Sequence, residues 1–296
     1  MRKKIFQIIV IGTSLLLAGC GCRGEMKRDA SGKQVLSGYI TLSGAFALYP
    51  LAIQWADEFH RLHPDVDIDI SAGGAGKGIT DVLADQVDIA MVSRELKPQE
   101  KEKGALAYAV AKDAVVATIN ANNPVYRKLL QTGLSQKQAT AIWEGKTKMN
   151  VYTRSDACGA AETWAAFLEK KQEDLKGTGV FGDPGVAETL QKDVNGIGFN
   201  NIGYAYNDKT HKPTKGIAIV PIDVNGNGKL DAEEKFYDTL DELMDAIAKG
   251  KYPAPPARNL YLVTAGKPKN PVVVEFLKYV RTKGQRLNAP AGFVHI

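Results

Sequence analysis

Cysteine and histidine are scarce in this chain of 296 residues, which has three cysteines and four histidines. Three cysteines are too few for the disulfide framework that stabilises many small secreted proteins. None of the histidines stands in a recognisable nucleophile or metal pattern, which argues against hydrolytic chemistry. Their positions are His60, His63, His211 and His295.

Long apolar runs and excess charge are also lacking once the start of the chain is set aside. After residue 20 no apolar run approaches the length of a membrane span. The formal net charge is +5, but three of the basic residues lie in the first four positions. The remaining 35 basic and 33 acidic residues give only +2. This near-neutral body argues against a nucleic-acid surface.

The first twenty residues have the composition of an export signal. Three basic residues precede an apolar run over residues 5–18, and small residues then lead to Cys20. A basic start, a short apolar core and a small-residue cleavage site are typical of a secretory signal. The cysteine at the cut resembles that of a bacterial lipoprotein, so we expect removal of residues 1–19 and a lipid on Cys20. The alternative, an uncleaved anchor helix, is disfavoured by the loop-like small residues that follow.

Strand-like and helix-like segments alternate through the rest of the chain. Residues 37–42, 66–70 and 87–92 read as strands separated by helical segments. This order is typical of a parallel sheet covered by helices. A long β-branched run over residues 107–120 and a strand over residues 259–264 predict two crossings between a first and a second lobe.

The predicted fold class is α/β, with two α/β lobes and a central cleft, where ligands commonly bind. Cys22 falls in a flexible tether and Cys158 in the body, so a disulfide between them has no evident purpose. The predicted divisions are a lipoprotein signal peptide at 1–19, the tether at 20–34, lobe 1 at 35–110 and 258–296, and lobe 2 at 111–257.

Three loops share one layout, in which a strand leads through small residues into the start of a helix. They are residues 43–47, 73–78 and 154–160. The N–H groups at a helix start carry partial positive charge, and glycines let an anion approach the backbone. Together the loops predict a site for a small oxyanion, although tight turns use glycine too. The second loop is not a nucleotide P-loop, because no Gly-Lys-Ser/Thr ending follows.

Two arginines could supply the counter-charge for such an anion. Asp156 is spaced so that its carboxylate could orient Arg154, and arginine binds a tetrahedral oxyanion through two N–H groups. The alternative for Arg154 is a surface ion pair of little consequence. Arg94, which follows the strand ending near Ser93, is the second candidate, and its alternative is an ordinary loop arginine.

Several short motifs follow one another along the chain in a characteristic order. They are Ser43-Gly44, Tyr49-Pro50-Leu51, Gly74-Ala75-Gly76-Lys77-Gly78-Ile79, residues 88–96, Asn122-Asn123-Pro124-Val125, Ile142-Trp143-Glu144-Gly145-Lys146, Arg154-Ser155-Asp156, Gly196-Ile197-Gly198-Phe199, Phe276-Leu277 and Gly284-Gln285. In this order they resemble the phosphate-binding component of the phosphate-specific ABC transporter, in the type II branch of the periplasmic binding proteins. The resemblance runs over about residues 37–285. It implies a type II periplasmic-binding-protein-like fold and capture of phosphate between the lobes.

The sequence departs from this family where the family places hydroxyl donors. Ala47 replaces a Thr or Ser in the first loop, and Ala75 replaces a Ser in the second. Cys158-Gly159-Ala160 replaces Ser-Gly-Thr in the third. A hydrogen bond to a charged group contributes about 1.5–3 kcal/mol, so the loss of several would weaken phosphate binding unless backbone N–H groups compensate.

The identity of the anion therefore stays open. Ser93 stands where the best-known branch of the family has an aspartate that accepts the phosphate proton. Cys158 could be a polarizable contact for a thiophilic ligand such as an arsenic oxyanion. The alternative for Cys158 is a small buried apolar residue.

We expect an exported, lipid-anchored solute-binding protein, not an enzyme, that captures phosphate or a related oxyanion for an ABC permease. A sensor or adhesion module on the same fold and an exported hydrolase are the alternatives. We expect no nucleic-acid partner, and contact with the membrane only through the lipid. The predicted ligand-binding residues are Ser43, Gly44, Ala47, Ala75, Gly76, Lys77, Ser93, Arg94, Arg154, Asp156, Cys158, Gly159 and Ala160.

A second motif is unrelated to the predicted cleft. Residues 223–234 match the EF-hand calcium loop, with Gly228 at the sharp turn. The alternative is a polar Asn-Gly turn. We expect one structural Ca²⁺ of modest affinity, because two of the ligands are neutral amides. The predicted ligands are Asp223, Asn225, Asn227, the carbonyl of Lys229, Asp231 and Glu234.

Overall fold

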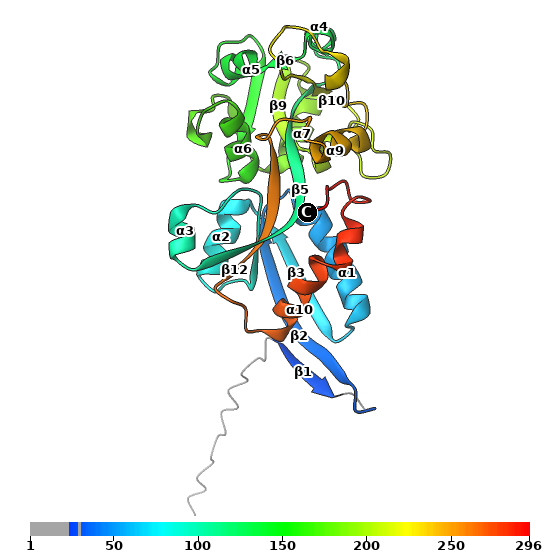
Figure 1. Cartoon of the computed structure of the whole chain (residues 1–296). Helices are drawn as coiled ribbons and strands as arrows, with labels where there is room; N and C mark the ends of the chain where they lie inside the picture. The colour runs from blue at the N-terminus through cyan, green and yellow to red at the C-terminus, as the bar shows by residue number, and fades with distance from the viewer. Residues whose placement is uncertain (1–23, 29–30) are drawn as a thin grey trace, which may run out of the picture.

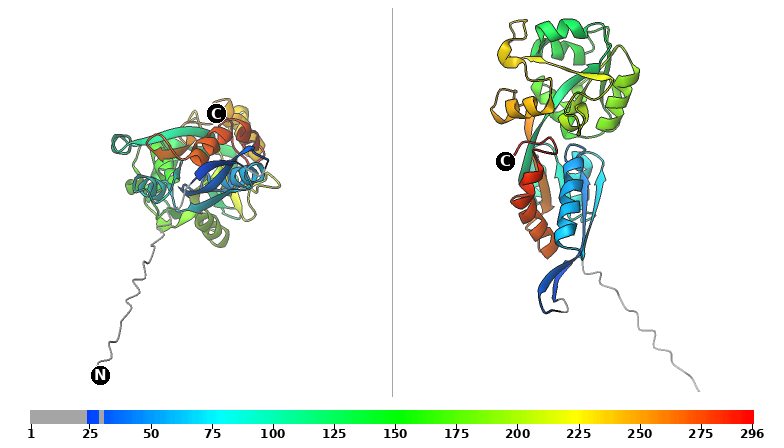
Figure 2. Two further views of the ribbon diagram at one scale, coloured as in Figure 1. Left: turned by 90° about the horizontal axis from the view of Figure 1, so that it is seen from below. Right: turned by 90° about the vertical axis from the view of Figure 1, so that its right-hand side faces the viewer.

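The computed structural model describes residues 24–28 and 31–296, so the predicted signal peptide, Cys20 and Cys22 lie outside the described residues. Two α/β lobes are joined by two long strands that run between them (Figure 1). A view from the side shows the same division (Figure 2). Among the helices of the described residues, none has the length and apolar character needed to cross a membrane.

Lobe 1 is a sheet covered by helices on both faces. Its first helix, α1, has apolar residues on one face and a proline in its first turn, where proline is tolerated. That face buries Leu51, Trp55 and Phe59 in the core of the lobe. The elements of lobe 1 are β1 (Gly24–Arg28), β2 (Gln34–Gly44), α1 (Tyr49–Leu62), β3 (Val66–Ala72), α2 (Ala75–Leu83), β4 (Ile89–Val92), α3 (Pro98–Glu102), β12 (Ala257–Ala265), α10 (Pro271–Val280) and η3 (Lys283–Leu287).

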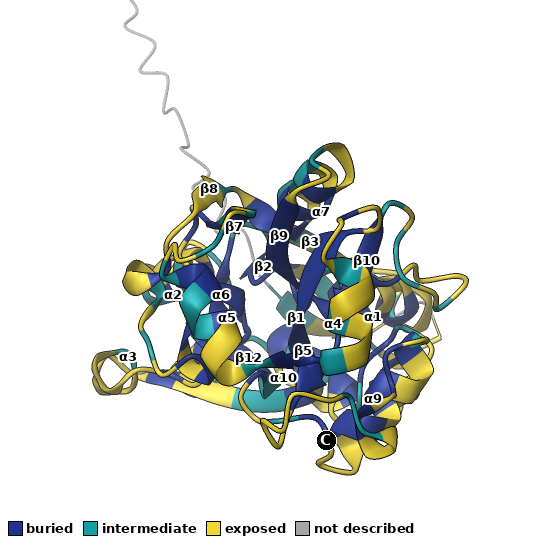
Figure 3. Ribbon diagram, turned by 90° about the horizontal axis from the view of Figure 1, so that it is seen from above, coloured by how far each residue is buried: buried dark blue, intermediate teal, exposed yellow. Residues whose placement is uncertain are grey.

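Lobe 2 has its own core, in which aromatic residues pack against the strands. Trp143, Trp164 and Phe199 contact one another there. From above, strand β9 is dark blue, which marks burial, and exposed helix surfaces surround it (Figure 3). Its elements are α4 (Tyr126–Thr132), β6 (Leu134–Ser135), α5 (Gln136–Trp143), β7 (Asn150–Arg154), α6 (Gly159–Phe167), η1 (Gln172–Asp174), β8 (Thr178–Val180), α7 (Gly182–Lys192), β9 (Gly196–Asn201), α8 (Ile202–Ala205), β10 (Ile217–Val220), β11 (Ile222–Asp223), η2 (Ala232–Glu234) and α9 (Leu240–Ala248).

One sheet continues through both lobes. The strand order is β1-β2-β4-β12-β5-β9-β7-β8, with β3 paired to β2 and β10 paired to β5. Strand β5 (Ala105–Asn120) is antiparallel to β12, and Asp113 lies opposite Arg258. On β5, Ala111 belongs to the core of lobe 1 and Ala114 to the core of lobe 2. The chain therefore crosses between the lobes at Asp113.

The tether prediction is wrong for residues 24–28. These residues form β1, which pairs with the start of β2 in antiparallel register, so that Glu25 lies opposite Ser37. The physical reason is that the edge of β2 presents unpaired backbone N–H and C=O groups, which a neighbouring segment can satisfy. The expectation of a loop over residues 73–78 also needs correction, because α2 already begins at Ala75.

Candidate anion-binding site

The three loops predicted from the sequence meet between the lobes. In lobe 1, the carbonyl of Gly44 accepts hydrogen bonds from the amides of Gly73 at 2.9 Å and Gly74 at 3.0 Å. Across the cleft, the amide of Gly76 donates to the carbonyl of Ala157 in lobe 2 at 3.1 Å. The first loop therefore holds the second, and the second contacts the third.

Two glycines permit this close approach. Gly44 has φ of +135°, and a Cβ there would come within 2.2 Å of the carbonyl oxygen of Met91. Gly159 begins α6 in lobe 2, and a Cβ there would come within 2.3 Å of the Ser93 hydroxyl of lobe 1. Any larger residue at either position would push apart segments that the site needs together.

Arg154 is the buried cation of this region. It ends β7, and its side chain is 1 % exposed. Its Nε and Nη2 donate to the two carboxylate oxygens of Asp156 at 2.8 and 2.7 Å, as the sequence predicted for this pair. Its Nη1 donates to Asp183 at 2.6 Å. Burial alone would lower the pKa of the guanidinium, but the charges of Asp183 and Asp156 raise it above the ordinary arginine value.

Asp183 is a site residue that the sequence analysis missed. It lies in the first turn of α7 and is fully buried. Besides Arg154, its carboxylate accepts the backbone amide of Asn201 at 2.8 Å and the side-chain amide of Asn201 at 2.7 Å. Its sequence neighbours, Gly182 and Pro184, are ordinary turn residues, so no motif distinguishes this aspartate from a surface one.

The start of α6 carries the third loop. Cys158 is the N-cap, and its Sγ accepts the amide of Ala161 at 3.4 Å. Burial raises the pKa of the Cys158 thiol to about 12, so the group is neutral near pH 7. The first amides of α6, those of Gly159 and Ala160, have no acceptor inside the helix, because the residues four positions before them precede its start. These amides fit the anion-binding role predicted for them.

Several other predicted residues are engaged with partners inside the protein. Ala47 and Ala75 lie in the core of lobe 1, and Cys158 and Ala160 in the core of lobe 2. On the second loop, the Lys77 ammonium pairs with Asp81 one turn later. The buried Ser43 hydroxyl donates to the same carboxylate. The hydroxyl and the ammonium that the sequence assigned to the ligand are thus engaged with Asp81.

Arg94 holds the two lobes together. Its Nη1 and Nη2 donate to the carboxylate of Glu100 at 2.8 and 2.7 Å within lobe 1. Its Nε lies 3.0 Å from Glu162 of lobe 2, and Lys97 pairs with the same carboxylate at 3.0 Å. The sequence predicted Arg94 as an anion ligand, whereas the structure commits its guanidinium to these two carboxylates.

Replacing Glu162 with glutamine should open the cleft of the ligand-free protein. The change removes both ion pairs that cross between the lobes at Arg94 and Lys97, each partly exposed and contributing about 1 kcal/mol or less. The radius of gyration from small-angle X-ray scattering should increase at low salt, and added salt should have the same effect on the unaltered chain. Glu144→Gln is the matched control, because Glu144 pairs with Lys146 and Lys170 inside lobe 2. Identical scattering from both variants would contradict the expected opening.

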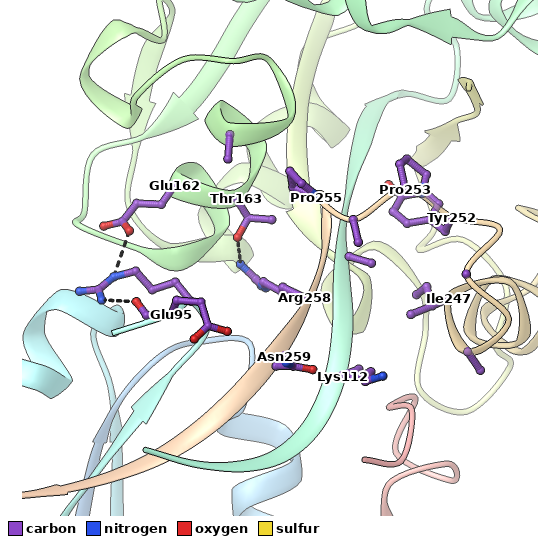
Figure 4. Close-up of a pocket in the computed structure, with 16 residues that line it drawn as sticks. Glu95, Lys112, Glu162, Thr163, Ile247, Tyr252, Pro253, Pro255, Arg258 and Asn259 are labelled. Carbon is purple, nitrogen blue, oxygen red and sulfur yellow. Dashed lines mark hydrogen bonds and ion pairs between the residues drawn. The ribbon is translucent and has the colours of Figure 1, made fainter. Parts of the chain in front are cut away.

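A buried polar network connects Arg154 to the crossing strands. The side chain of Asn201, which binds Asp183, also accepts a hydrogen bond from Arg258. Arg258 donates from Nε to Asp113 on β5 at 2.8 Å, and from Nη1 to the hydroxyl of Thr163 at 3.2 Å. The contact between Arg258 and Thr163 lies at the edge of a pocket of about 750 Å³ (Figure 4). The site and the crossing point therefore share one chain of hydrogen bonds.

The predicted calcium loop is a compact turn closed by its own acidic residues. Asp223 accepts the amides of Gly226 and Gly228, each at 2.8 Å. Asp231 accepts the side-chain amides of Asn225 at 2.9 Å and Asn227 at 2.8 Å. In the described part of the chain no three His, Cys, Asp or Glu residues are grouped closely enough to hold a metal ion. The calcium ion thus stays a prediction.

Comparison with known proteins gives the family. A model of the PBP superfamily domain matches residues 29–283. The chain belongs to this superfamily. Among curated members of similar sequence, the phosphate-binding protein PstS of Bacillus subtilis is 25% identical over 227 residues, which cover 70% of this chain and 73% of the relative. That of Pseudomonas aeruginosa is 27% identical over 297 residues, covering 88% and 83%.

Solved structures show the same PBP superfamily fold. A putative phosphate ABC transporter substrate-binding protein from Clostridium perfringens, with bound phosphate, has a TM-score of 0.70 at 21% identity, covering 88% of this chain and all of that one. A reduced form of OxyR from Neisseria meningitidis has a TM-score of 0.56 at 11% identity, also covering 88% and 100%. Because these neighbours carry different names on one fold, the likeness establishes the fold of this superfamily member and leaves its function to the site.

Proposed function

We propose that this chain is a solute-binding protein that captures phosphate or a related oxyanion and delivers it to an ABC transporter. The observation that carries the proposal is the position of Arg154, buried beside the point where three small-residue loops from two lobes converge. The amides at the start of α6 add positive potential without adding a mobile charge. The curated relatives with which the chain aligns are named as phosphate-binding proteins.

Capture, and not conversion, is the chemistry that this site supports. Its thiol is neutral and serves as a helix N-cap, and Arg154 has no titratable base among its hydrogen-bond partners other than the two carboxylates that pair with it. We therefore propose a binding role without catalysis. Incubation with a chromogenic phosphate ester should release no product above the buffer rate.

Isothermal titration calorimetry of the chain lacking residues 1–19 tests the proposal. Phosphate, arsenate, arsenite, sulfate and molybdate should be titrated in turn at low salt. Phosphate monoesters and phosphonates complete the set. We expect at least one of these anions to bind with a stoichiometry of one. Absence of binding across the whole set would overturn the proposal.

We also propose that the protein is exported and held to a membrane by a lipid on Cys20. The support is the sequence pattern of residues 1–20. A Cys20→Ser variant expressed in a bacterial host should move from the membrane fraction to the soluble exported fraction. Equal membrane retention of both forms would count against the lipid.

We propose in addition that the loop of residues 223–234 binds one Ca²⁺ that stabilises lobe 2. Asp223 and Glu234, at positions one and twelve of the motif, are both buried, and the exposed Asp231 lies between Asn225 and Asn227. Rotation of the two side-chain amides would present their oxygens in place of their nitrogens. Three carboxylates, two amide oxygens and one carbonyl form a donor set that suits a hard cation.

Removal of calcium should lower the melting temperature. We expect Ca²⁺ at millimolar concentration to raise the thermal midpoint of the chelator-treated protein. Mg²⁺ should do so less, because it gives up its hydration water reluctantly and demands a near-ideal octahedron. Asp231→Asn should abolish the increase. Asp241→Asn is the matched control, since Asp241 lies outside the loop and pairs with His211. A melting temperature insensitive to chelator and to Ca²⁺ would refute the site.

A further inference from the structure

Phe46 is a side chain of lobe 1 that lies on lobe 2. Its ring centroid is 5.4 Å from Cζ of Arg154, and its ring meets Phe181 edge to face at 5.7 Å. A Cβ on Gly182 would come within 3.1 Å of the ring. Its carbonyl accepts the hydroxyl of Tyr204 at 3.1 Å. Phe46 therefore covers one face of the guanidinium with an aromatic surface.

The edges of the same guanidinium are largely occupied. Arginine has five N–H donors in a fixed plane, and three of those of Arg154 point to Asp156 and Asp183. Two N–H groups are left for a ligand. A bare phosphate dianion, which has four oxygens to satisfy, finds few charged donors on this residue.

The neutral donors around Phe46 are few as well. The Ser43 hydroxyl of the first loop donates to Asp81. The neighbours of Phe46 in that loop, Ala45 and Ala47, have no side-chain donor, and neither does Ala75 at the start of α2. The first loop thus places an aromatic ring, and no free side-chain donor, against the guanidinium of Arg154, while the amides at the start of α6 add positive potential.

We propose that Phe46 determines the specificity of the site, so that the preferred ligand is an oxyanion carrying an apolar substituent, such as a phosphonate or a phosphate monoester. This inference rests on the proposed function. The oxygens bind the guanidinium and the α6 amides, and the substituent packs on the rings of Phe46 and Phe181. An apolar group on the ligand replaces an oxygen for which these two rings offer no donor, and it removes apolar surface from water.

Calorimetry with three probes tests this specificity on the chain lacking residues 1–19. Inorganic phosphate, methylphosphonate and phenylphosphonate are titrated into the unaltered protein, Phe46→Ser and Phe46→Leu. The unaltered protein and Phe46→Leu should bind at least one phosphonate about tenfold or more tighter than phosphate, the discrimination that one small apolar group provides. Phe46→Ser, which supplies a hydroxyl and uncovers the guanidinium, should reverse the order. A thermal melt of each variant verifies folding.

Two results would overturn the inference, and they are distinguishable. If phosphate binds the unaltered protein at least as tightly as both phosphonates, and Phe46→Ser keeps that order, the assignment of Phe46 is wrong while the proposed function stands. If no probe and no oxyanion of the earlier set binds any of the three proteins, the proposed function fails and the inference fails with it.

Discussion

Replacing Arg154 with alanine should abolish anion binding and lower the free energy of unfolding by about 3–5 kcal/mol. The reason is that two carboxylates, Asp156 and Asp183, are buried around this one cation. Without Arg154, the two carboxylates are either buried as uncompensated charges or must become protonated to stay buried. Urea denaturation gives the stability, and calorimetry with the oxyanion set gives the binding.

Two further variants separate charge from general damage at this position. Arg154→Lys keeps one positive charge but loses the planar fork, so it should recover part of the stability and little of the binding. Arg61→Ala removes an exposed arginine of α1, 75 % exposed, and should change neither quantity measurably. An Arg154→Ala protein as stable as Arg61→Ala would show that the buried triad is not the charge centre of the site.

Replacing Arg258 with methionine should destabilise the protein by about 3–5 kcal/mol, because it leaves Asp113 buried without its cation. The same change withdraws the hydrogen bonds that Arg258 gives to Thr163 and Asn201. Since Asn201 holds Asp183, we expect anion affinity to fall as well, although Arg258 is not among the residues proposed to contact the anion. Urea denaturation and calorimetry measure the two effects on the same sample.

The pH dependence of this variant identifies Asp113 as the cause. Burial raises the pKa of Asp113 above the ordinary aspartate value, and Arg258 opposes that rise. A carboxyl with a raised pKa binds more protons in the folded state than in the unfolded state, so stability falls as the pH increases through that range. Arg258→Met should steepen the fall. Adding Asp113→Asn should flatten it, and an unaltered slope in the double variant would assign the effect elsewhere.

The lobes and their connection could be predicted because they follow from local patterns. Alternating strand and helix signals define the parallel units, and the long β-branched run predicted at residues 107–120 lies within one strand, β5 (Ala105–Asn120). The partner of Arg154 at Asp156 followed from a spacing of two along one strand end. Such relations are short in sequence, and a single chain shows them directly.

The rest of the site depends on residues that meet only in three dimensions. Asp183 is 29 positions from Arg154, and Phe46 reaches Arg154 from the other lobe. Arg94 was predicted to bind the anion because the sequence does not show its two partners, Glu100 and Glu162, which lie on separate helices. Charge in a sequence does not reveal how it is neutralised after folding. This is why an anion-binding site could be predicted while several of the side chains that build it could not.

The continuous sheet has a mechanical consequence. Strands β5 and β12 are paired with each other on both sides of Asp113, so the lobes are not joined by a flexible linker. A rotation of one lobe relative to the other must change the twist of these two paired strands, and the twist of paired strands has a preferred value. We therefore expect loaded and empty forms to differ by a modest angle. If the proposed function holds, the ABC permease would detect that angle best at the rims of the lobes farthest from the crossing strands, because a given rotation displaces those rims most.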